Sequence, residues 1–171
     1  KALLLLMSPI LLVNCKKDNQ TSNTTNKDEV QNSNKITKSD INNIKYVDYI
    51  LSDQSLKALN EWVKFQELQE EIEKLKNGET NFFKDDIVLS TTLLEELENT
   101  IPENINTPEV TTRITVLKNT LFNLNSELKF ERRDKNYSLK SIKELLIASS
   151  NLKLQINKKL EMDSQNIIKP Q

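Results

Sequence analysis

The chain of 171 residues has no histidine, one glycine, one cysteine and four prolines. Without histidine it lacks an imidazole base, a His metal ligand and any Ser-His-Asp triad. One glycine cannot build the Gly-rich loops that cradle phosphates, and one cysteine cannot form an intrachain disulfide. No nucleophile paired with a base can be named either. We therefore expect no catalytic, metal-binding or cofactor-binding residues, and a protein that is not an enzyme.

Charge and composition narrow the class further. The 24 Lys and Arg residues nearly balance the 25 Asp and Glu residues, which gives no sign of a nucleic-acid binder. The length suits a single domain. Scarce glycine together with abundant Leu, Lys, Glu, Asn and Ile predicts an all-α fold.

The N-terminal residues form a short apolar run. Lys1 precedes residues 2–13, which only Ser8 and Pro9 interrupt. A helix that crosses a bilayer needs roughly 17–25 apolar residues, so this run is too short, and Pro9 weakens a long helix further. It fits the apolar region of a signal peptide, about 7–15 residues long. Since the printed chain does not begin with Met, we expect a few residues to be missing before Lys1.

The run ends in Leu12-Val13-Asn14-Cys15. This segment resembles the lipobox of bacterial lipoproteins, in which Leu, a small residue or Val, and a small residue precede a cysteine. The resemblance implies that the Cys15 thiol receives a diacylglyceryl group, that cleavage between Asn14 and Cys15 removes residues 1–14, and that the new amine is acylated. Asn14 departs from the family pattern, where Gly, Ala or Ser is usual. An ordinary signal peptide with an incidental cysteine is the alternative.

Residues 15–36 are predicted to be the lipidated cysteine and a flexible, disordered tether. The segment is polar, and Val30 is its only branched aliphatic residue before Lys35, so it cannot bury enough apolar surface to offset its ordering entropy. A flexible coil of about 20 residues spans roughly 25 Å. Lys16-Lys17-Asp18 resembles the export signals of surface lipoproteins in some Gram-negative bacteria. The start of a solvated linker is the equal alternative.

The first helical region is predicted to begin near Thr37, where Thr37 and Asp40 fit a capping box. Ser52 offers a second cap, which predicts either a kink or a break in a long first helix. Gly78 is placed to end this region with a left-handed cap. The apolar positions at helical spacing are Ile41, Ile44, Val47, Leu51, Leu56, Leu59, Trp62, Phe65, Leu68, Ile72 and Leu75.

Three further helices are predicted after Gly78. Asp85 or Asp86 caps the second, Thr107-Pro108 opens the third, and Ser138 caps the last, with Tyr137 packing on Ile142. The apolar stripe of the second helix is Ile87, Thr91, Leu94, Leu97 and Ile101. The third has an a/d heptad seam of Val110, Ile114, Leu117, Leu121, Leu124 and Leu128. The last stripe is Ile142, Leu145, Ser149, Leu152, Ile156 and Leu160.

Short turns between these helices favour antiparallel neighbours. We therefore expect residues 37–164 to form an antiparallel up-down bundle of about four helices with coiled-coil-like packing. The first helix is either long or broken near Ser52. Residues 165–171 are expected to be a frayed tail.

Two acidic clusters are candidate sites. Carboxylates can bind a divalent ion or act in acid–base chemistry, but bundle metal sites also use Glu-x-x-His, and the chain has no histidine. Glu70 precedes Lys74 by four residues, the favoured order for an ion pair. We interpret both clusters as solvated helix faces. The members are Glu67, Glu70, Glu71 and Glu73 in the first cluster, and Glu95, Glu96 and Glu98 in the second.

Other candidates are basic or aromatic. Trp62 and Phe65 lie on the apolar stripe and are interpreted as core. Of Phe82 and Phe83, one could be an exposed contact, but capping the open end of the bundle is the favoured role. A basic segment could contact a small anion or glycan, although a helix C-terminus followed by a turn is favoured. Its residues are Arg132, Arg133, Asp134 and Lys135.

The sequence thus predicts a lipid-anchored protein of the bacterial cell envelope, at the outer membrane and facing the periplasm or the surface. Acyl chains on Cys15, such as palmitate, hold it on the membrane, and an unidentified protein is its partner. We expect a non-enzymatic binding or structural role. The alternatives are a surface adhesin or host-factor binder, and a homo-oligomeric envelope component that uses the seam of the third helix.

Overall fold

The computed structural model of the chain describes residues 35–85, 87–130 and 134–165. The predictions for the signal peptide, for Cys15, for most of the tether and for nearly all of the tail lie outside these residues. Within them the chain forms helices and no strand, which confirms the predicted all-α class. The elements are α2 (Lys38–Asn42), α3 (Asp53–Ala58), α4 (Val63–Lys76), α5 (Asn81–Lys84), α6 (Ile87–Asn99), the 3-10 helix η1 (Glu103–Ile105), α7 (Pro108–Lys129) and α8 (Lys135–Ser164).

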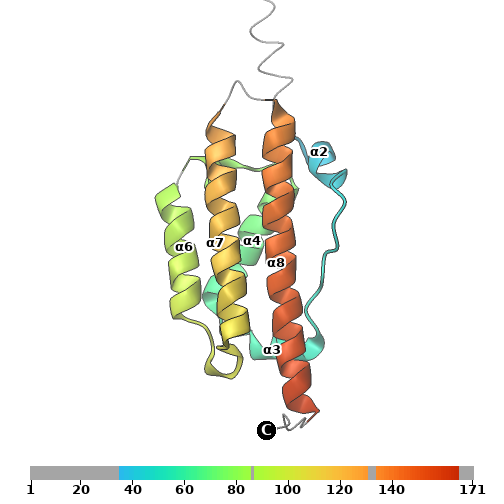
Figure 1. The fold of residues 1–171 in the computed structure, drawn as a ribbon, viewed down its shortest axis with the longest axis vertical. Coiled ribbons are helices and arrows are strands. Elements are labelled where there is room, and N and C mark those ends of the chain that lie inside the picture. Colours follow the sequence, from blue (N-terminus) through green and yellow to red (C-terminus); the bar gives the residue numbers. More distant parts are fainter. Residues whose placement is uncertain (1–34, 86, 131–133, 166–171) are drawn as a thin grey trace, which may run out of the picture.

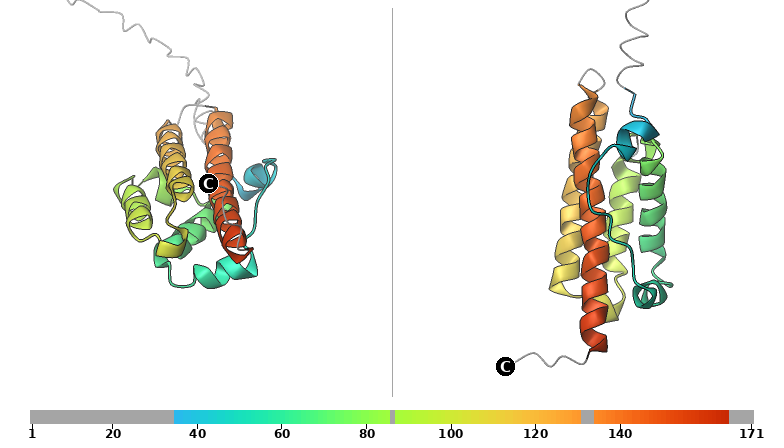
Figure 2. Two further views of the ribbon diagram at one scale, coloured as in Figure 1. Left: turned by 60° about the horizontal axis from the view of Figure 1, so that its bottom comes forward. Right: turned by 90° about the vertical axis from the view of Figure 1, so that its right-hand side faces the viewer.

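The four longest helices, α4, α6, α7 and α8, lie side by side along the long axis of the molecule (Figure 1). In the right-hand view of Figure 2, α7 and α8 form one layer on the left, and α4 and α6 form a second layer on the right. Their inward-facing side chains share one apolar core. No helix within the described residues has both the length and the apolar character that crossing a bilayer requires.

The sequence predicts α7 most accurately. Thr107 is its N-cap and accepts a hydrogen bond from the amide of Val110, and Pro108 is its first residue. All six residues of the predicted seam are buried, and the most exposed of them, Leu128, shows only 8% of its surface. The seam packs largely against α8 of the same chain. It therefore does not form an outer surface that a second copy could contact.

The predicted start of α8 is wrong. The helix begins at Lys135 because Asp134 is the N-cap and accepts a hydrogen bond from the amide of Asn136. Ser138 lies inside the first turn, where its hydroxyl donates to the carbonyl of Glu127. The apolar stripe of α8 is confirmed, since all six of its predicted residues are buried.

The first helical region is much shorter than predicted. Thr37 and Asp40 do form the capping box, but α2 lasts only five residues. The apolar spacing that continues to Leu51 predicts a helix, whereas residues 44–52 form no helix and run as an extended segment beside α8 (Figure 1). Val47, which the stripe places in the core, is 63% exposed.

Residues 44–52, here called the strap, run along α8 from α2 to α3 (Figures 1 and 2). The hydroxyl of Ser150 on α8 accepts a hydrogen bond from the amide of Tyr49 at 2.7 Å. The same hydroxyl donates to the carbonyl of Val47 at 2.8 Å. One serine thus satisfies two backbone groups that a helix would have paired internally.

Asn157 repeats this arrangement lower on α8. Its side-chain oxygen accepts from the amide of Ser52 at 3.0 Å, and its side-chain nitrogen donates to the carbonyl of Ile50 at 2.7 Å. The strap is extended because polar side chains of α8 bind its backbone. Helical spacing of apolar residues within the strap cannot report this, since the competing groups lie about 100 residues away.

After the strap, the predicted first helix is interrupted once more, between α3 and α4. Ser52 caps α3 through the amide of Ser55, which settles the open alternative in favour of a break. α3 ends at Ala58, and four residues separate it from Val63, the first residue of α4. The predicted continuous stripe fails at Leu56, which is 54% exposed. The other predicted residues of this stripe are buried: Leu59, Trp62, Phe65, Leu68, Ile72 and Leu75.

Gly78 ends α4 as predicted. Its φ is +91°, its amide donates to the carbonyl of Leu75 at 2.8 Å, and the amide of Glu79 donates to the carbonyl of Lys74 at 3.0 Å. A Cβ at this position would lie 2.9 Å from the backbone nitrogen of Lys38. Gly78 therefore also provides the space in which the start of α2 sits.

The predicted second helix corresponds to α6. Asp85 is the C-cap of α5, so it is not the predicted cap of α6, and Asp86 lies outside the described residues. Leu94 and Leu97 of the stripe are buried, while its remaining members are partly exposed.

Candidate functional site: the groove between α4 and α6

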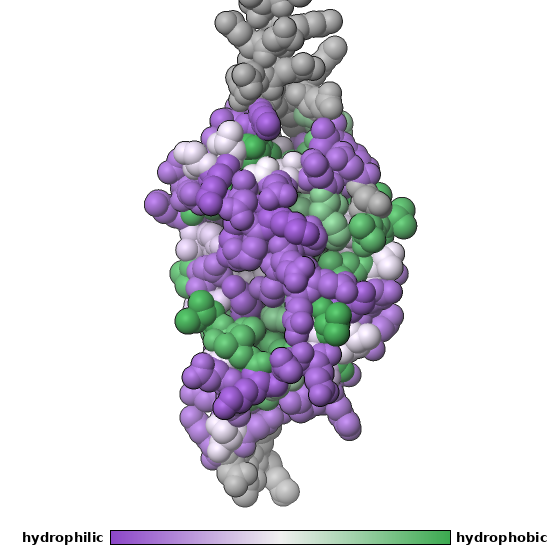
Figure 3. All heavy atoms as spheres, turned by 180° about the vertical axis from the view of Figure 1, so that it is seen from behind, coloured by the Kyte–Doolittle hydropathy of each residue, from purple (hydrophilic) through white to green (hydrophobic). Residues whose placement is uncertain are grey.

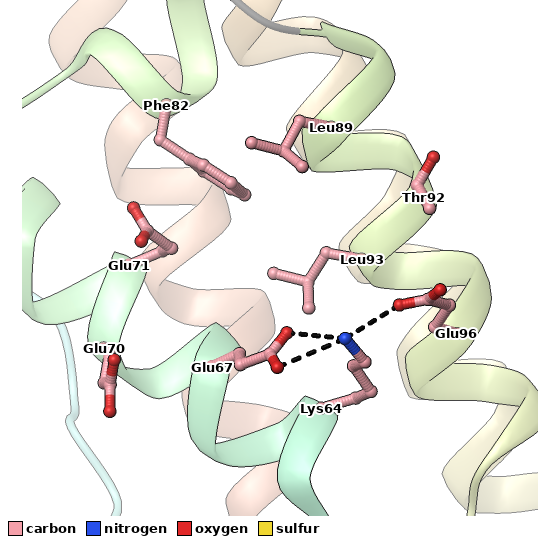
Figure 4. Close-up of a pocket in the computed structure, with 9 residues that line it drawn as sticks. All are labelled: Lys64, Glu67, Glu70, Glu71, Phe82, Leu89, Thr92, Leu93 and Glu96. Carbon is pink, nitrogen blue, oxygen red and sulfur yellow. Dashed lines mark hydrogen bonds and ion pairs between the residues drawn. The ribbon is translucent and has the colours of Figure 1, made fainter.

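One side of α4 and one side of α6 face each other across a groove (Figure 4). α4 turns its apolar stripe into the core, so the residues on the flank of that stripe reach the surface beside α6. The short helix α5 closes the upper end with one aromatic ring. The lining residues are Lys64, Glu67, Glu70 and Glu71 of α4, Phe82 of α5, and Leu89, Thr92, Leu93 and Glu96 of α6.

The groove is apolar in its middle and acidic at its edges. Its volume is about 250 Å³, enough for one or two large side chains. The side chains of Phe82, Leu89 and Leu93 point into it from three directions (Figure 4). Leu93 is 6% exposed and forms the floor, whereas Leu89 is 54% exposed and forms part of the rim.

Lys64 bridges the two walls at the lower end. Its ammonium lies 2.9 Å from a carboxylate oxygen of Glu67 on its own helix and 2.9 Å from one of Glu96 on α6. Hydrogen bonding to Glu96, followed in importance by hydrogen bonding to Glu67, raises the pKa of Lys64 above its ordinary value. Carboxylates of α4 and α6 are thus close enough together to hold one cation between them.

Glu70 and Glu71 lie one turn further along the same wall. The sequence predicts an ion pair between Glu70 and Lys74, and this prediction is wrong. Lys74 lies 2.7 Å from Glu71 instead, three residues away. Glu70 is exposed and forms no ion pair with any residue that the structure describes. Its carboxylate faces solvent at the edge of the groove.

The two adjacent phenylalanines have separate roles. Phe83 is fully buried, and its carbonyl accepts a hydrogen bond from Asn125 of α7 at 2.7 Å. Phe82 is only partly buried and meets Phe83 edge to face, with ring centroids 5.1 Å apart. One of the pair therefore joins the core and the other lines the groove.

The remaining acidic residues are not simply solvated. Glu96 binds Lys64, and Glu98 forms an ion pair with Lys118 of α7. Glu73 lies 2.8 Å from Lys76. Only Glu95 is a plainly exposed member of the second cluster.

The aromatic and basic candidates outside the groove are structural where they are described. Trp62 and Phe65 are buried as predicted, stacked with ring centroids 5.2 Å apart, and Trp62 donates to the hydroxyl of Thr100. Lys135 lies 2.9 Å from Asp40 of α2, so it links the start of α8 to the capping box. Arg132 and Arg133 lie outside the described residues.

The hydrogen bond with Lys135, followed by those with Thr37, lowers the pKa of Asp40 below its ordinary value. This carboxylate therefore stays charged in its two roles, as part of the cap and as the partner of Lys135. The sequence identified only the first role, because the second depends on a residue 95 positions away.

The sequence also missed Asp48, which holds the strap against two helices. Its carboxylate lies 2.8 Å from the ammonium of Lys76 on α4 and 2.6 Å from that of Lys153 on α8. Burial raises the pKa of Asp48, but hydrogen bonds from Lys153 and Lys76 outweigh this effect and leave the pKa below its ordinary value. No local pattern marks Asp48, since both partners are distant in sequence.

The described residues contain no group of three or more His, Cys, Asp or Glu side chains arranged to hold a metal ion. The groove is suited to non-covalent recognition, since it combines an apolar floor with carboxylates of fixed position. No family model matches the chain, and no curated protein or solved structure matches it either.

Proposed function

We propose that this is a lipid-anchored protein of the bacterial cell envelope with a non-enzymatic binding role. The anchor rests on Leu12-Val13-Asn14-Cys15 after a short apolar run. Each buried CH₂ group contributes about 0.8 kcal/mol, so two or three acyl chains on Cys15 hold a protein on a bilayer lastingly. The tether then sets how far the helical part reaches from the membrane.

The helical part is proposed to be a four-helix up-down bundle. Four long helices lie side by side, and the connections between successive ones are short, which favours antiparallel neighbours. α2, the strap and α3 are added to this bundle and cover α8. The first element of the bundle is then α4 and not a helix that begins near Thr37.

The observation that carries the binding role is the groove between α4 and α6. Apolar side chains from α5 and α6 are left partly exposed there, surrounded by carboxylates of both walls. An exposed apolar patch with a polar rim is typical of an interaction site. A protein partner is the expected ligand, because the groove is open and elongated along two helices.

The anchor is tested with cells that express the full chain and are grown with labelled palmitate. We expect label in the wild type and none in a Cys15→Ala variant, which should also leave the membrane fraction. Asn14→Gly is the matched control, because it restores the family pattern and should label at least as well as wild type. A Cys15→Ala protein that stays on the membrane contradicts the anchor.

The binding role is tested by placing a photo-crosslinking amino acid at Thr92, which is exposed in the groove, and at Asn123, which is exposed on α7. In intact cells we expect a discrete crosslinked product from position 92 and none from position 123. Equal products at both positions, or none at position 92, contradict binding through the groove. Protease added to the same cells tells whether the protein faces outward, as the adhesin alternative requires.

A further inference from the structure

We infer that the groove binds a cationic amphipathic segment of its partner, such as a helix with Lys or Arg on one face and Leu or a similar residue on the other. This inference rests on the proposed function, since it names the partner of that same groove. An apolar side chain of the partner enters between Phe82, Leu89 and Leu93. Its cations bind Glu70 on α4 and approach Glu71 and Glu96, which already pair with Lys74 and Lys64.

Charge complementarity is the first argument. The groove is lined by four carboxylates and by the ammonium of Lys64, and Lys74 beside it pairs with Glu71, which leaves a net negative charge. Its field therefore attracts cations and repels anionic ligands such as nucleic acids or acidic lipid surfaces. The same field disfavours a second copy bound face to face, because a two-fold axis would place glutamates opposite glutamates.

The position of Lys64 shows how such a cation is held. Glu67 and Glu96 each approach its ammonium to 2.9 Å, one from each wall. Glu70, by contrast, has no ion pair within the described part of the chain. The groove therefore has Lys64 at its lower end and Glu70, without an ion pair in this part of the chain, above it, while Glu71 already pairs with Lys74.

Apolar exposure is the second argument. Leu89 is 54% exposed at the rim of the groove. A ligand that carries only charges would leave this apolar side chain in contact with water. Val88, its neighbour on α6, is 70% exposed and extends this apolar surface beyond the groove. Figure 3 shows this side of the molecule, where hydrophobic areas (green) interrupt a mainly hydrophilic surface. A ligand must carry both apolar groups and cations to match the groove.

The probe is a synthetic peptide of Leu, Lys and Ala, about 14 residues or roughly 21 Å of helix, with its leucines on one face and its lysines on the other. A permuted peptide of the same composition, with both types scattered, is the control. Spermine is the control for charge alone. Binding to the full-length, detergent-solubilised protein is measured by fluorescence anisotropy with labelled peptide and by competition with spermine.

We expect the amphipathic peptide to bind at least about tenfold more tightly than the permuted one, and its affinity to fall with added salt. Leu89→Ser should weaken binding by about tenfold, and Glu70→Gln by about two- to fivefold. The matched controls are Val116→Ser on α7 and Glu95→Gln on α6, both exposed outside the groove, which should bind as wild type.

Equal binding of the two peptides, full competition by spermine, or no effect of Leu89→Ser would overturn the inference. The crosslinking and peptide experiments together distinguish failure of this inference from failure of the proposed function. A crosslinked product at position 92 without peptide binding leaves a groove that binds some other partner. Loss of both results removes the binding role of the groove altogether.

Discussion

α7 and the segment from α2 to α3 have similar apolar spacing, but only α7 is a long helix. The seam of α7 is buried against α8, and Thr107 and Pro108 define its start. The earlier segment also begins with a good cap, yet it leaves the helical path after five residues. The comparison shows that periodicity predicts a helix reliably only where the stripe has an apolar partner surface.

The reason for the difference lies on α8. One side of this helix carries the apolar stripe that receives α7, and another side carries Ser150, Lys153 and Asn157. These three polar side chains bind the strap through its backbone and through Asp48. An extended chain that is fixed in this way needs no internal hydrogen bonds.

The two regions should differ most in how much a truncated apolar side chain destabilises the fold. Leu117 in the seam is fully buried, so Leu117→Ala should lower the free energy of unfolding by about 3 kcal/mol. Val47→Ala in the strap should change it by less than about 0.5 kcal/mol. Urea unfolding followed by circular dichroism measures both. Similar losses for the two variants would mean that the strap is packed like a helix.

Substitution of Gly78 should cause the next largest loss of stability, because the end of α4 and the start of α2 meet there. Gly78→Ala places a side chain at φ +91° and 2.9 Å from the nitrogen of Lys38, which should cost about 2 kcal/mol. Glu79→Ala is the neighbouring control and should cost far less. If the space at Gly78 positions α2, amide exchange in α2 should accelerate in the glycine variant and stay unchanged in the control.

Ser150→Ala removes two hydrogen bonds between α8 and the strap. The amide of Tyr49 and the carbonyl of Val47 lose their partner, so we expect a loss of about 1 kcal/mol. Ser126→Ala is the control, since that hydroxyl donates to the carbonyl of Phe122 in its own helix. Proteolysis within the strap should increase for Ser150→Ala alone. Unchanged proteolysis would show that the strap is held by other contacts.

The smallest effect concerns pH. The ion pairs of Asp48 stabilise the fold above its ordinary pKa of 3.8, and this contribution is lost as the pH falls through the lower pKa of the folded state. Because the side chain is 37% exposed, the loss should stay below about 1 kcal/mol. Asp48→Asn should reduce the difference in unfolding free energy between pH 7 and pH 3. An identical pH dependence in both proteins contradicts this role.

The sequence predicted most of the core and part of the candidate site. Caps at Thr37, Ser52 and Thr107, the stop at Gly78 and three stripes depend on residues close in sequence, so local patterns were sufficient. The cap at Asp134 was missed because a serine four residues later also fits the pattern.

The groove was harder to predict. Its acidic residues were identified on each helix, but as solvated faces, because sequence spacing shows which residues share a helix and not which helices face each other. Lys64 was missed for the same reason, since its bridge to Glu96 spans 32 positions. Asp48 was missed because its partners, Lys76 and Lys153, are 28 and 105 positions away.

The strap also has a consequence for insertions and deletions. Ser150 and Asn157 are seven residues apart on a helix, a rise of about 10.5 Å. The amides that they bind, those of Tyr49 and Ser52, are three residues apart on an extended chain, about 10 Å. The two lengths are nearly equal, so both side chains can bind the strap at once. One residue added between Tyr49 and Ser52 would move the second pair by about 3.3 Å, beyond hydrogen-bond reach. The strap should therefore tolerate substitution of its exposed side chains but not a change in its length.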